Sequence, residues 1–171
     1  METRKSMIRL GKLTDYALVL MTHVARKPVE QLHTSAALSQ ESRLPLPTVT
    51  KVLKKLQQGV LLTSHRGVKG GYTLARNADE ISVAEIIAAM EGPLALTACS
   101  SHVPGACDLE SYCLIKDNQR IINRVVGSAL ERVTLSDLAH PLQVVTIQEK
   151  RDDDKRGGRA PVIAFITGRI Q

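Results

Sequence analysis

Residues 34–76 constrain the fold of this chain more than any other segment. A short helical stretch, TSAALSQESR, is followed by a four-residue break that contains Pro45, and then by a second helical stretch. The second stretch carries an apolar stripe at helical spacing, formed by Val49, Val52, Leu53 and Leu56. Gly59 follows it at the position of a C-cap glycine. Two short helices joined by a tight turn are typical of a helix-turn-helix.

The next stretch, VLLTSHRGVKGGYTLA at 60–75, alternates apolar and polar residues on both sides of a glycine-rich basic turn. This pattern is typical of a β-hairpin, whose tip we expect at RGVKGG. A hairpin directly after the second helix of a helix-turn-helix forms a wing. The sequence therefore predicts a mainly α fold with a small β wing, a winged helix-turn-helix.

Basic residues concentrate in the same part of the chain. Between Arg43 and Arg76 there are seven Lys or Arg residues and no Asp or Glu, while the whole chain has a net charge of +6. A local basic surface is expected where a protein contacts DNA phosphates. The alternative is a solvated basic surface with a phosphate-loop-like turn, but GVKGG lacks the spacing of a nucleotide-binding loop. An aromatic content of 2% disfavours a single-strand binder that stacks bases.

Helical periodicity also marks the segments on either side. A first helix begins at Leu13, with Thr14 expected as its N-cap and Asp15 in its first turn. SVAEIIAAMEG, at 82–92, predicts a short helix that a Ser82–Glu85 capping box opens and a glycine closes. These two helices extend the winged domain that we predict over residues 7–92.

A longer helix is predicted from Leu114 to about Val133. Its apolar stripe consists of Ile115, Ile122, Val125, Val126, Ala129, Leu130 and Val133. A helix of about 30 Å projects from a small domain and cannot bury this stripe on its own core. We expect it to pack against its copy in a second subunit, as a dimerisation helix. The alternative is a helix that folds back on its own chain.

All three cysteines lie in CSSHVPGACDLESYC, at 99–113, a stretch without Lys or Arg. An odd number of cysteines in a reducing compartment does not form a disulfide framework. A loop between two helices lets three thiolates converge on one centre, although three are too few for a four-coordinate zinc or an ordinary cluster. Spacing alone leaves an iron-sulfur cluster, zinc and unligated thiols equally open.

Patterns of other protein classes do not stand out. The chain lacks a run of about 18 apolar residues, and its start, METRKSMIRL, lacks the apolar centre of a secretory signal. We therefore expect a cytoplasmic protein with no membrane partner. We also expect no enzyme, because no nucleophile is paired with a base and the cysteines have no basic neighbours along the chain.

Several motifs together resemble the Rrf2 family of winged-helix transcription regulators. They are MIRLGKLTDYAL, LPLPTVTKVLKKLQQGVLLTSHRGVKGGYTLAR and ISVAEIIAAMEGP, followed by three closely spaced cysteines before a long helix. LTDYA, HRGVKGGY and ALTACSSH resemble most closely the branch that regulates the SUF system of iron-sulfur assembly. The resemblance covers about residues 7–142, and the charged tail from residue 143, expected to be disordered, departs from it.

The resemblance implies an iron-sulfur cluster, 2Fe-2S or 4Fe-4S, in a binding loop at 93–113 with Cys99, Cys107 and Cys113 as ligands. One branch of the family completes its site with a histidine three residues after the last cysteine, where this chain has Lys116. Nitric-oxide sensors of the family use an aspartate of the other subunit instead, and the matching residue is Asp15. As a plain first-turn helix residue Asp15 would need no such role. His102 and Glu110 are rival ligands, and His102 is the stronger because imidazole binds iron well.

The resemblance further implies a homodimer on double-stranded operator DNA, with residues 114–142 as the dimerisation helix and a short C-terminal helix. The expected DNA-binding residues are Ser35, Thr48, Thr50, Lys51, Lys54, Arg66 and Lys69. The most direct reading is a repressor of an iron-sulfur assembly operon. Two alternatives of the same fold are a nitric-oxide sensor and a cluster-free regulator of cysteine metabolism that a partner protein controls.

Overall fold

The structure is a computed structural model of the 171-residue chain, and it describes residues 10–67, 70–101, 103, 105–109 and 111–140. Its elements in chain order are α1 (Lys12–Ala25), α2 (Ser35–Ser42), α3 (Leu46–Gln58), β1 (Leu62–His65), β2 (Gly71–Leu74), η1 (Ala78–Glu80), α4 (Val83–Glu91), η2 (Ala98–Ser100), α5 (Lys116–Arg132) and α6 (Leu135–Ala139). The predicted fold class, mainly α with a β wing, is confirmed. No helix within the described ranges is long and apolar enough to cross a membrane.

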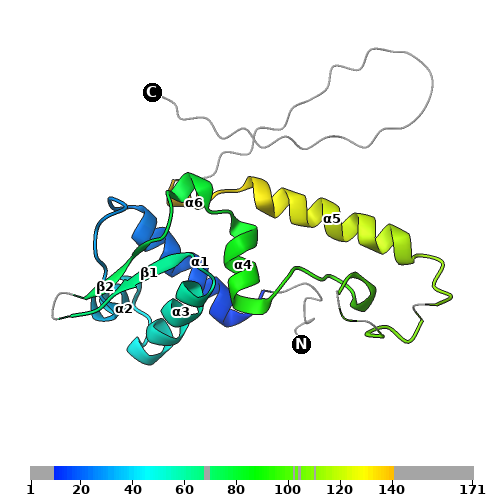
Figure 1. The fold of residues 1–171 in the computed structure, drawn as a ribbon, viewed down its shortest axis with the longest axis horizontal. Helices are drawn as coiled ribbons and strands as arrows, with labels where there is room; N and C mark the ends of the chain where they lie inside the picture. The colour runs from blue at the N-terminus through cyan, green and yellow to red at the C-terminus, as the bar shows by residue number, and fades with distance from the viewer. Residues whose placement is uncertain (1–9, 68–69, 102, 104, 110, 141–171) are drawn as a thin grey trace, which may run out of the picture.

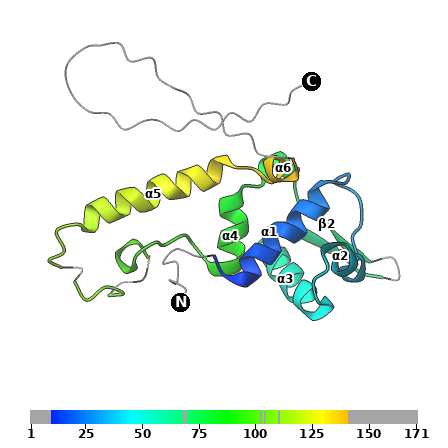
Figure 2. The same cartoon turned by 180° about the vertical axis from the view of Figure 1, so that it is seen from behind.

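The helices α1 to α4 and the hairpin form one body, and α5 projects from it (Figure 1). The hairpin points away on the side opposite to α5, and the view from behind shows the same arrangement (Figure 2). The described residues between 93 and 115 lead from the end of α4 along α5 to its start. The molecule therefore consists of a compact head and an arm of two antiparallel parts.

The hydrophobic core lies in the head. Its fully buried side chains come from α1, α2, α3, α4 and the segments around them: Ala17, Leu20, Met21, Leu38, Val49, Val52, Leu53, Leu56, Ile81, Ile86 and Leu135. The apolar stripe predicted for α3 is completely buried, which leaves the opposite side of α3 facing solvent. Burial of each such side chain stabilises the fold by about 1.5–3 kcal/mol relative to exposure.

The predicted C-cap of α3 is confirmed at Gly59, but the residue in the left-handed conformation is Val60, with φ of 58°, and not the glycine. The backbone N–H groups of Val60 and Leu61 donate to the carbonyls of Gln57 and Leu56, which makes a Schellman motif. The glycine at position 59 is explained by packing, because a Cβ there would lie 2.7 Å from the Cβ of Ala89. The glycine allows α3 to approach α4.

The start of α1 also differs from the prediction, because the helix begins at Lys12 with Gly11 as N-cap. Thr14 is not a cap but a buried residue inside the helix, and its hydroxyl donates to the Oε1 atom of Glu91. The backbone N–H of Gly11 donates to the same oxygen at 2.6 Å. A carboxylate from the end of α4 therefore satisfies the first turn of α1, where the helix dipole favours negative charge.

The start of α4 pairs with the connection between α5 and α6. The N–H of Val83 donates to the carbonyl of Val133 at 2.8 Å, and the N–H of Leu135 donates to that of Ile81 at 2.7 Å. The predicted capping box of Ser82 and Glu85 is confirmed. A second capping box, Thr134 with Asp137, opens α6 beside it. Two helix starts and one strand-like bridge thus hold the base of α5 against the head.

The wing is a two-stranded antiparallel sheet in which Leu62 pairs with Leu74 and His65 with Gly71. A bridge of two backbone hydrogen bonds, 2.8 and 2.9 Å, joins Tyr72 of β2 to His33, which precedes α2. A Cβ at Gly71 would lie 2.8 Å from the carbonyl oxygen of His33. The absence of a side chain at Gly71 therefore allows the wing to attach to the helix-turn-helix.

Two glycine-to-alanine variants should change stability in opposite directions. Gly71→Ala forces a methyl group against the backbone of His33 and should lower the free energy of unfolding by about 1–3 kcal/mol. Gly127→Ala, inside α5, meets only the Cδ2 atom of Leu94 at 3.8 Å and should raise it by about 0.5–1 kcal/mol. Urea titrations of both variants measure the two changes, and equal midpoints would contradict the packing described at Gly71.

Candidate nucleic-acid interface and cysteine segment

The side of α3 that faces away from the core carries the predicted DNA-binding residues. Thr50, Lys51 and Lys54 are exposed and Thr48 is half-buried. The Thr50 hydroxyl donates to the carbonyl of Leu46, one turn back, at 2.9 Å. Its oxygen can still accept a hydrogen bond. This surface offers hydroxyl, methyl and ammonium groups on one exposed helix face, which suits the edges of bases in a major groove.

Lys55, the residue after Lys54, does not belong to this exposed face. It is half-buried, and its ammonium group donates to the carbonyl of Met90 in the last turn of α4 at 2.8 Å. The positive charge lies at a helix C-terminus, where the helix dipole favours it. Lys55 therefore joins α3 to α4.

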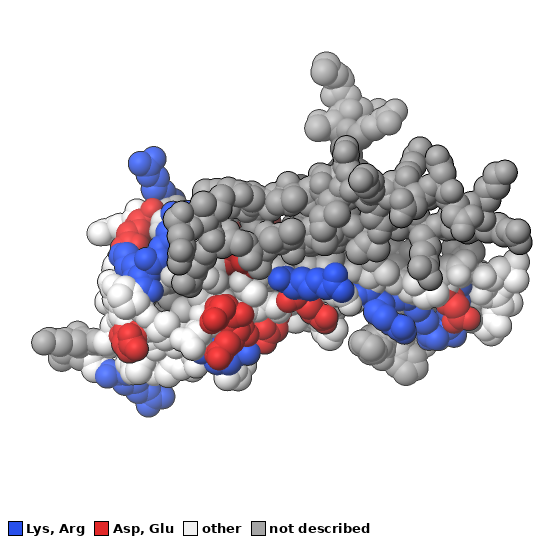
Figure 3. All heavy atoms as spheres, turned by 90° about the horizontal axis from the view of Figure 1, so that it is seen from above, with Lys and Arg blue, Asp and Glu red and all other residues white. Residues whose placement is uncertain are grey.

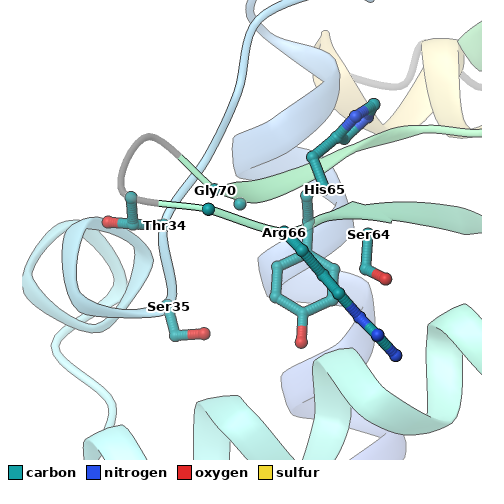
Figure 4. Close-up of a pocket in the computed structure, with 9 residues that line it drawn as sticks. Thr34, Ser35, Ser64, His65, Arg66 and Gly70 are labelled. Atoms are coloured by element: carbon teal, nitrogen blue, oxygen red, sulfur yellow. The ribbon is translucent and has the colours of Figure 1, made fainter.

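Arg66 is exposed at the end of β1, next to the tip of the wing. Its side chain and that of His65 point to opposite sides of the hairpin, and Arg66 extends on the side of α3 (Figure 4). The His65 ring pairs across the strands with the Thr73 hydroxyl at 3.0 Å. The two sides of the wing thus differ, and the side that carries Arg66 is the one next to α3.

An open cavity of about 450 Å³ separates the wing from the start of α2. Thr34 and Ser35 line it from α2, and Ser64 and Arg66 line it from β1 and the turn (Figure 4). The Thr34 hydroxyl accepts from the backbone N–H of Ala37 and so caps α2. Ser35, the first residue of α2, is half-buried at the edge of this cavity. Hydroxyl and guanidinium donors on both walls are groups that bind phosphate oxygens.

His33, which pairs with Tyr72, has only 3% of its surface exposed, and its Nε2 atom has no hydrogen-bond partner among the described residues. Burial lowers the pKa of His33; nearby Lys27 acts in the same direction and Glu41 opposes it. The neutral ring is therefore favoured in the folded protein. Through its backbone, His33 anchors the wing to the start of α2.

The cysteine segment, residues 93–115, carries three free thiols. Cys99, Cys107 and Cys113 are each half-buried. The Thr97 hydroxyl lies 3.2 Å from the Cys99 sulfur. Among the described residues, no three His, Cys, Asp or Glu side chains come close enough together to hold a metal ion. The segment thus presents accessible sulfur donors without gathering them at one point.

Basic residues do approach Cys99, although none is near it in sequence. Arg120 and Arg124 of α5 line a cavity of about 380 Å³ together with Cys99, Ser100 and Ser101. Asn123, which lines the same cavity, also hydrogen-bonds the backbone of residues 94 and 96. Sequence analysis missed Asn123 because a single amide between Ile122 and Arg124 looks like any solvent-facing helix residue.

Asp15 is exposed in the first turn of α1. Its neighbour Thr14 contacts Glu91, and Gly92 and the cysteine segment follow directly after Glu91. The first turn of α1 and the start of the cysteine segment therefore share a fixed contact. Other predicted residues, Lys69, His102 and Glu110, lie outside the described residues, as does the tail from residue 141.

The arm exposes an apolar strip on α5. Ile121, Ile122 and Val125 are 55%, 50% and 64% exposed. Val126, Ala129 and Leu130 of the predicted stripe are half-buried, and the structure adds Ile121 to it. Seen from above, Lys and Arg side chains lie next to Asp and Glu side chains on the described part of the molecular surface (Figure 3). Residues 43–76, by contrast, contain no Asp or Glu.

A helix-turn-helix whose second helix buries one face and exposes the other, followed by a basic wing, defines a winged-helix DNA-binding protein. The model of the Rrf2 family, described as iron-dependent transcriptional regulators, matches residues 10–141. The chain belongs to the Rrf2 family and is a DNA-binding transcription regulator. The prediction that it is no enzyme is confirmed by relatives that are transcriptional regulators.

Relatives of several kinds share this fold. The chain is 28% identical over 149 residues to the HTH-type transcriptional regulator IscR of Pectobacterium atrosepticum, covering 87% of this chain and 90% of the relative. It is 28% identical over 131 residues to the regulator NsrR of Shouchella clausii, covering 77% and 88%. The solved structure of CymR, the global cysteine regulator of B. subtilis, matches with a TM-score of 0.60 and 26% identity, covering 77% of this chain and 96% of that one.

Proposed function

We propose that this regulator binds operator DNA as a homodimer and represses an iron-sulfur assembly operon of the SUF type while it holds an iron-sulfur cluster. The observation that carries the DNA-binding part is the exposed face of α3 beside the basic wing, in a stretch with seven positive and no negative side chains. The cluster part rests on three free thiols in one segment and on the resemblance to cluster-binding members of the family.

Each part of the interface has a distinct role. Thr48, Thr50 and Lys51 read base edges in the major groove, because they stand on the solvent side of α3. Arg66 enters the minor groove at the wing. Ser35, Lys54 and Lys69 bind phosphates. These phosphate contacts fix the register of the protein on the duplex without reading its sequence.

Dimerisation through α5 follows from its exposed apolar strip. Three large aliphatic side chains on one helix face are each at least half exposed. Such exposure is unfavourable in water and marks a contact surface. The occupant we propose is the same strip of a second copy, because two such helices bury each other's side chains by one symmetric contact. The two recognition helices then reach successive major grooves about one helical turn apart.

The cysteine residues suit the cluster in type. Cys99, Cys107 and Cys113 would hold it, since soft thiolates are the usual ligands of iron-sulfur clusters. Asp15, from the partner subunit, is the proposed fourth ligand, and His102 is the alternative. Bound there, the cluster would supply a redox-sensitive centre. Because the described residues do not gather the thiols, the segment must close further when it ligates iron. Opening and closing of the segment then bias the position of α5 and the spacing of the reading heads.

Two alternatives keep the DNA-binding part and change the signal. A cluster-free regulator of cysteine metabolism is favoured by the likeness to CymR. A nitric-oxide sensor is favoured by the likeness to NsrR. Protein purified without air that is colourless, contains no iron and still binds its operator would support the cluster-free alternative. Faster loss of visible absorbance with nitric oxide than with oxygen would support the sensor.

Removal of Arg66 and of Lys54 should affect DNA binding in different ways. Arg66→Ala should weaken operator binding by about 1–3 kcal/mol, because a groove contact is lost. Lys54→Ala should weaken all duplexes alike and reduce the slope of log K against log salt by about one. Fluorescence anisotropy titrations at several salt concentrations separate the two effects. Unchanged operator affinity of Arg66→Ala would contradict the assignment of the wing.

A lysine in the apolar strip should produce monomers. Ile122→Lys places a charge in a contact that excludes water and should weaken association by at least about 2 kcal/mol. Glu131→Lys puts the same group at an exposed position on another side of α5 and serves as the control. Sedimentation velocity measures the oligomeric state of each. Intact dimers of the Ile122→Lys protein would argue that α5 is not the seam.

The ligands of the cluster should fall into two groups. Each Cys→Ala variant at 99, 107 or 113 should lose most of its iron and sulfide, because too few thiolates remain. Asp15→Ala should keep a visible cluster with a shifted spectrum that bleaches faster in air, since a carboxylate is the more exchangeable ligand. His102→Ala should then resemble the unchanged protein. Absorption spectra with iron and sulfide assays decide, and the reverse result would make His102 the ligand.

A further inference from the structure

Helix α5 has two opposite faces with different contacts. At 100° per residue, Arg120, Asn123 and Gly127 share one face, because they are three and four positions apart. Ile121, Ile122 and Val125, the exposed apolar strip, lie on the other. The first face is covered by the cysteine segment of the same chain, which runs along it with η2 at one end. One helix thus carries both the proposed dimer contact and the support of the cysteine segment.

The Asn123 side chain holds the cysteine segment by two hydrogen bonds, to residues 94 and 96, which we call the clasp. Its Oδ1 atom accepts from the backbone N–H of Leu96 at 2.9 Å, and its Nδ2 atom donates to the carbonyl of Leu94 at 3.1 Å. One amide thereby satisfies a donor and an acceptor of an otherwise irregular backbone. Both bonds are part-buried, so water competes for them less than it would at the surface.

Contacts on either side of the clasp extend it toward Cys99. The Leu94 side chain packs beside Gly127, where a Cβ would lie 3.8 Å from the Leu94 Cδ2 atom. The Nε atom of Arg120 donates to the carbonyl of Cys99 at 3.5 Å. Between them, the Thr97 hydroxyl contacts the Cys99 sulfur and the Ser100 hydroxyl, at 3.2 and 2.8 Å. Residues 94–100 are thus held at three successive positions of α5: Gly127, Asn123 and Arg120.

We propose that Asn123 is the positioning residue of Cys99: by clasping residues 94–96 it fixes the short η2 turn that presents this sulfur, and it couples that turn to the helix that bears the apolar strip. Cys107 and Cys113 lie beyond the clasp, on a part of the segment that Asn123 does not contact through these bonds. Cys99 is therefore a fixed donor, and the other two approach it when the segment closes.

The consequence for signalling rests on the proposed function. If the cluster is held by the three thiols, the fixed position of Cys99 means that closure pulls the far part of the segment toward α5. The strain of closure then acts on α5 itself through the two amide bonds. Without these two bonds, Cys99 would be tied to α5 only by the Arg120 contact and, along the chain, by residues 113–116, so less of this strain would reach the dimer contact.

The first test uses the cluster-free full chain and measures thiol reactivity. Asn123→Asp keeps the acceptor for Leu96 but faces the Leu94 carbonyl with a second acceptor, and Asn123→Ala removes both bonds. Alkylation of Cys99 by iodoacetamide, followed by mass spectrometry, should speed up by about fivefold or more in each, as expected for the loss of one or two part-buried hydrogen bonds. Alkylation of Cys107 and Cys113 in the same molecules should stay within about twofold of the original rate.

Gln119→Glu is the matched control, because it makes the same amide-to-acid change one turn earlier on α5, where the described residues show no hydrogen bond from that side chain. Its Cys99 rate should equal that of the unchanged protein. Equal rates for the Asn123 variants, or a common rise at all three cysteines, would overturn the positioning role. Circular dichroism melts of every variant identify a common rise caused by unfolding.

The second test addresses the coupling in anaerobically reconstituted protein. Asn123→Asp should bleach in air several-fold faster than Gln119→Glu, because Cys99 is no longer fixed. Equal bleaching rates with a faster Cys99 alkylation would overturn the coupling to the cluster and leave the clasp standing. If the unchanged protein forms no cluster, the proposed function fails, and the alkylation rates alone decide the role of Asn123.

Discussion

The position of the arm depends on one short backbone pairing. Residues 81–83 and 133–135 form two hydrogen bonds of 2.7 and 2.8 Å, and each strand-like piece leads directly into a capped helix. Because Leu135 is fully buried in the core of the head, the pairing cannot slide without exposing it. The direction in which α5 leaves the head, and therefore where the cysteine segment and the apolar strip lie, follows from this junction.

The same junction also contacts the wing. The Glu85 carboxylate accepts from Ser82 in the capping box and forms an ion pair with Arg76 at 2.7 Å, just after β2. Although partial burial acts to raise it, hydrogen bonds from Ser82 and Arg76 lower the pKa of Glu85. Both partners are about two-fifths exposed, so the pair contributes little to stability. Its effect is geometric, since one carboxylate links the base of the wing to the start of α4.

Sequence patterns predicted the features whose partners lie a few residues away, and missed the contacts between residues that are far apart in the sequence. The buried stripe of α3, the hairpin and the capping box at Ser82 follow from periodicity and short motifs, because their partners are a few residues away. Thr14, Lys55 and Asn123 were misread or overlooked, since their partners lie 77, 35 and 27 or more residues away. A polar side chain on a helix has the same local pattern whether it meets water or a distant carbonyl.

The site shows the same division. Exposed Thr50, Lys51 and Lys54 are found on the open side of α3 because the opposite stripe predicted which side is buried. The arginines near Cys99 were not predicted, because they reach it from another element. The family resemblance predicts Cys99, Cys107 and Cys113 as ligands, whereas no periodic signal in the sequence describes how a segment of irregular backbone places three thiols.

Because α5 is long, a small rotation at its junction with the head moves its far end by several ångströms. Seventeen residues span about 25 Å, so a tilt of about 10° at Val133 moves the far end, next to Cys113, by about 4 Å. Conversely, a shift of about 4 Å at the start of α5 rotates its other end by only about 10°. A displacement of several ångströms in the cysteine segment therefore reaches the head as a small rotation about the backbone pairing at residues 133–135.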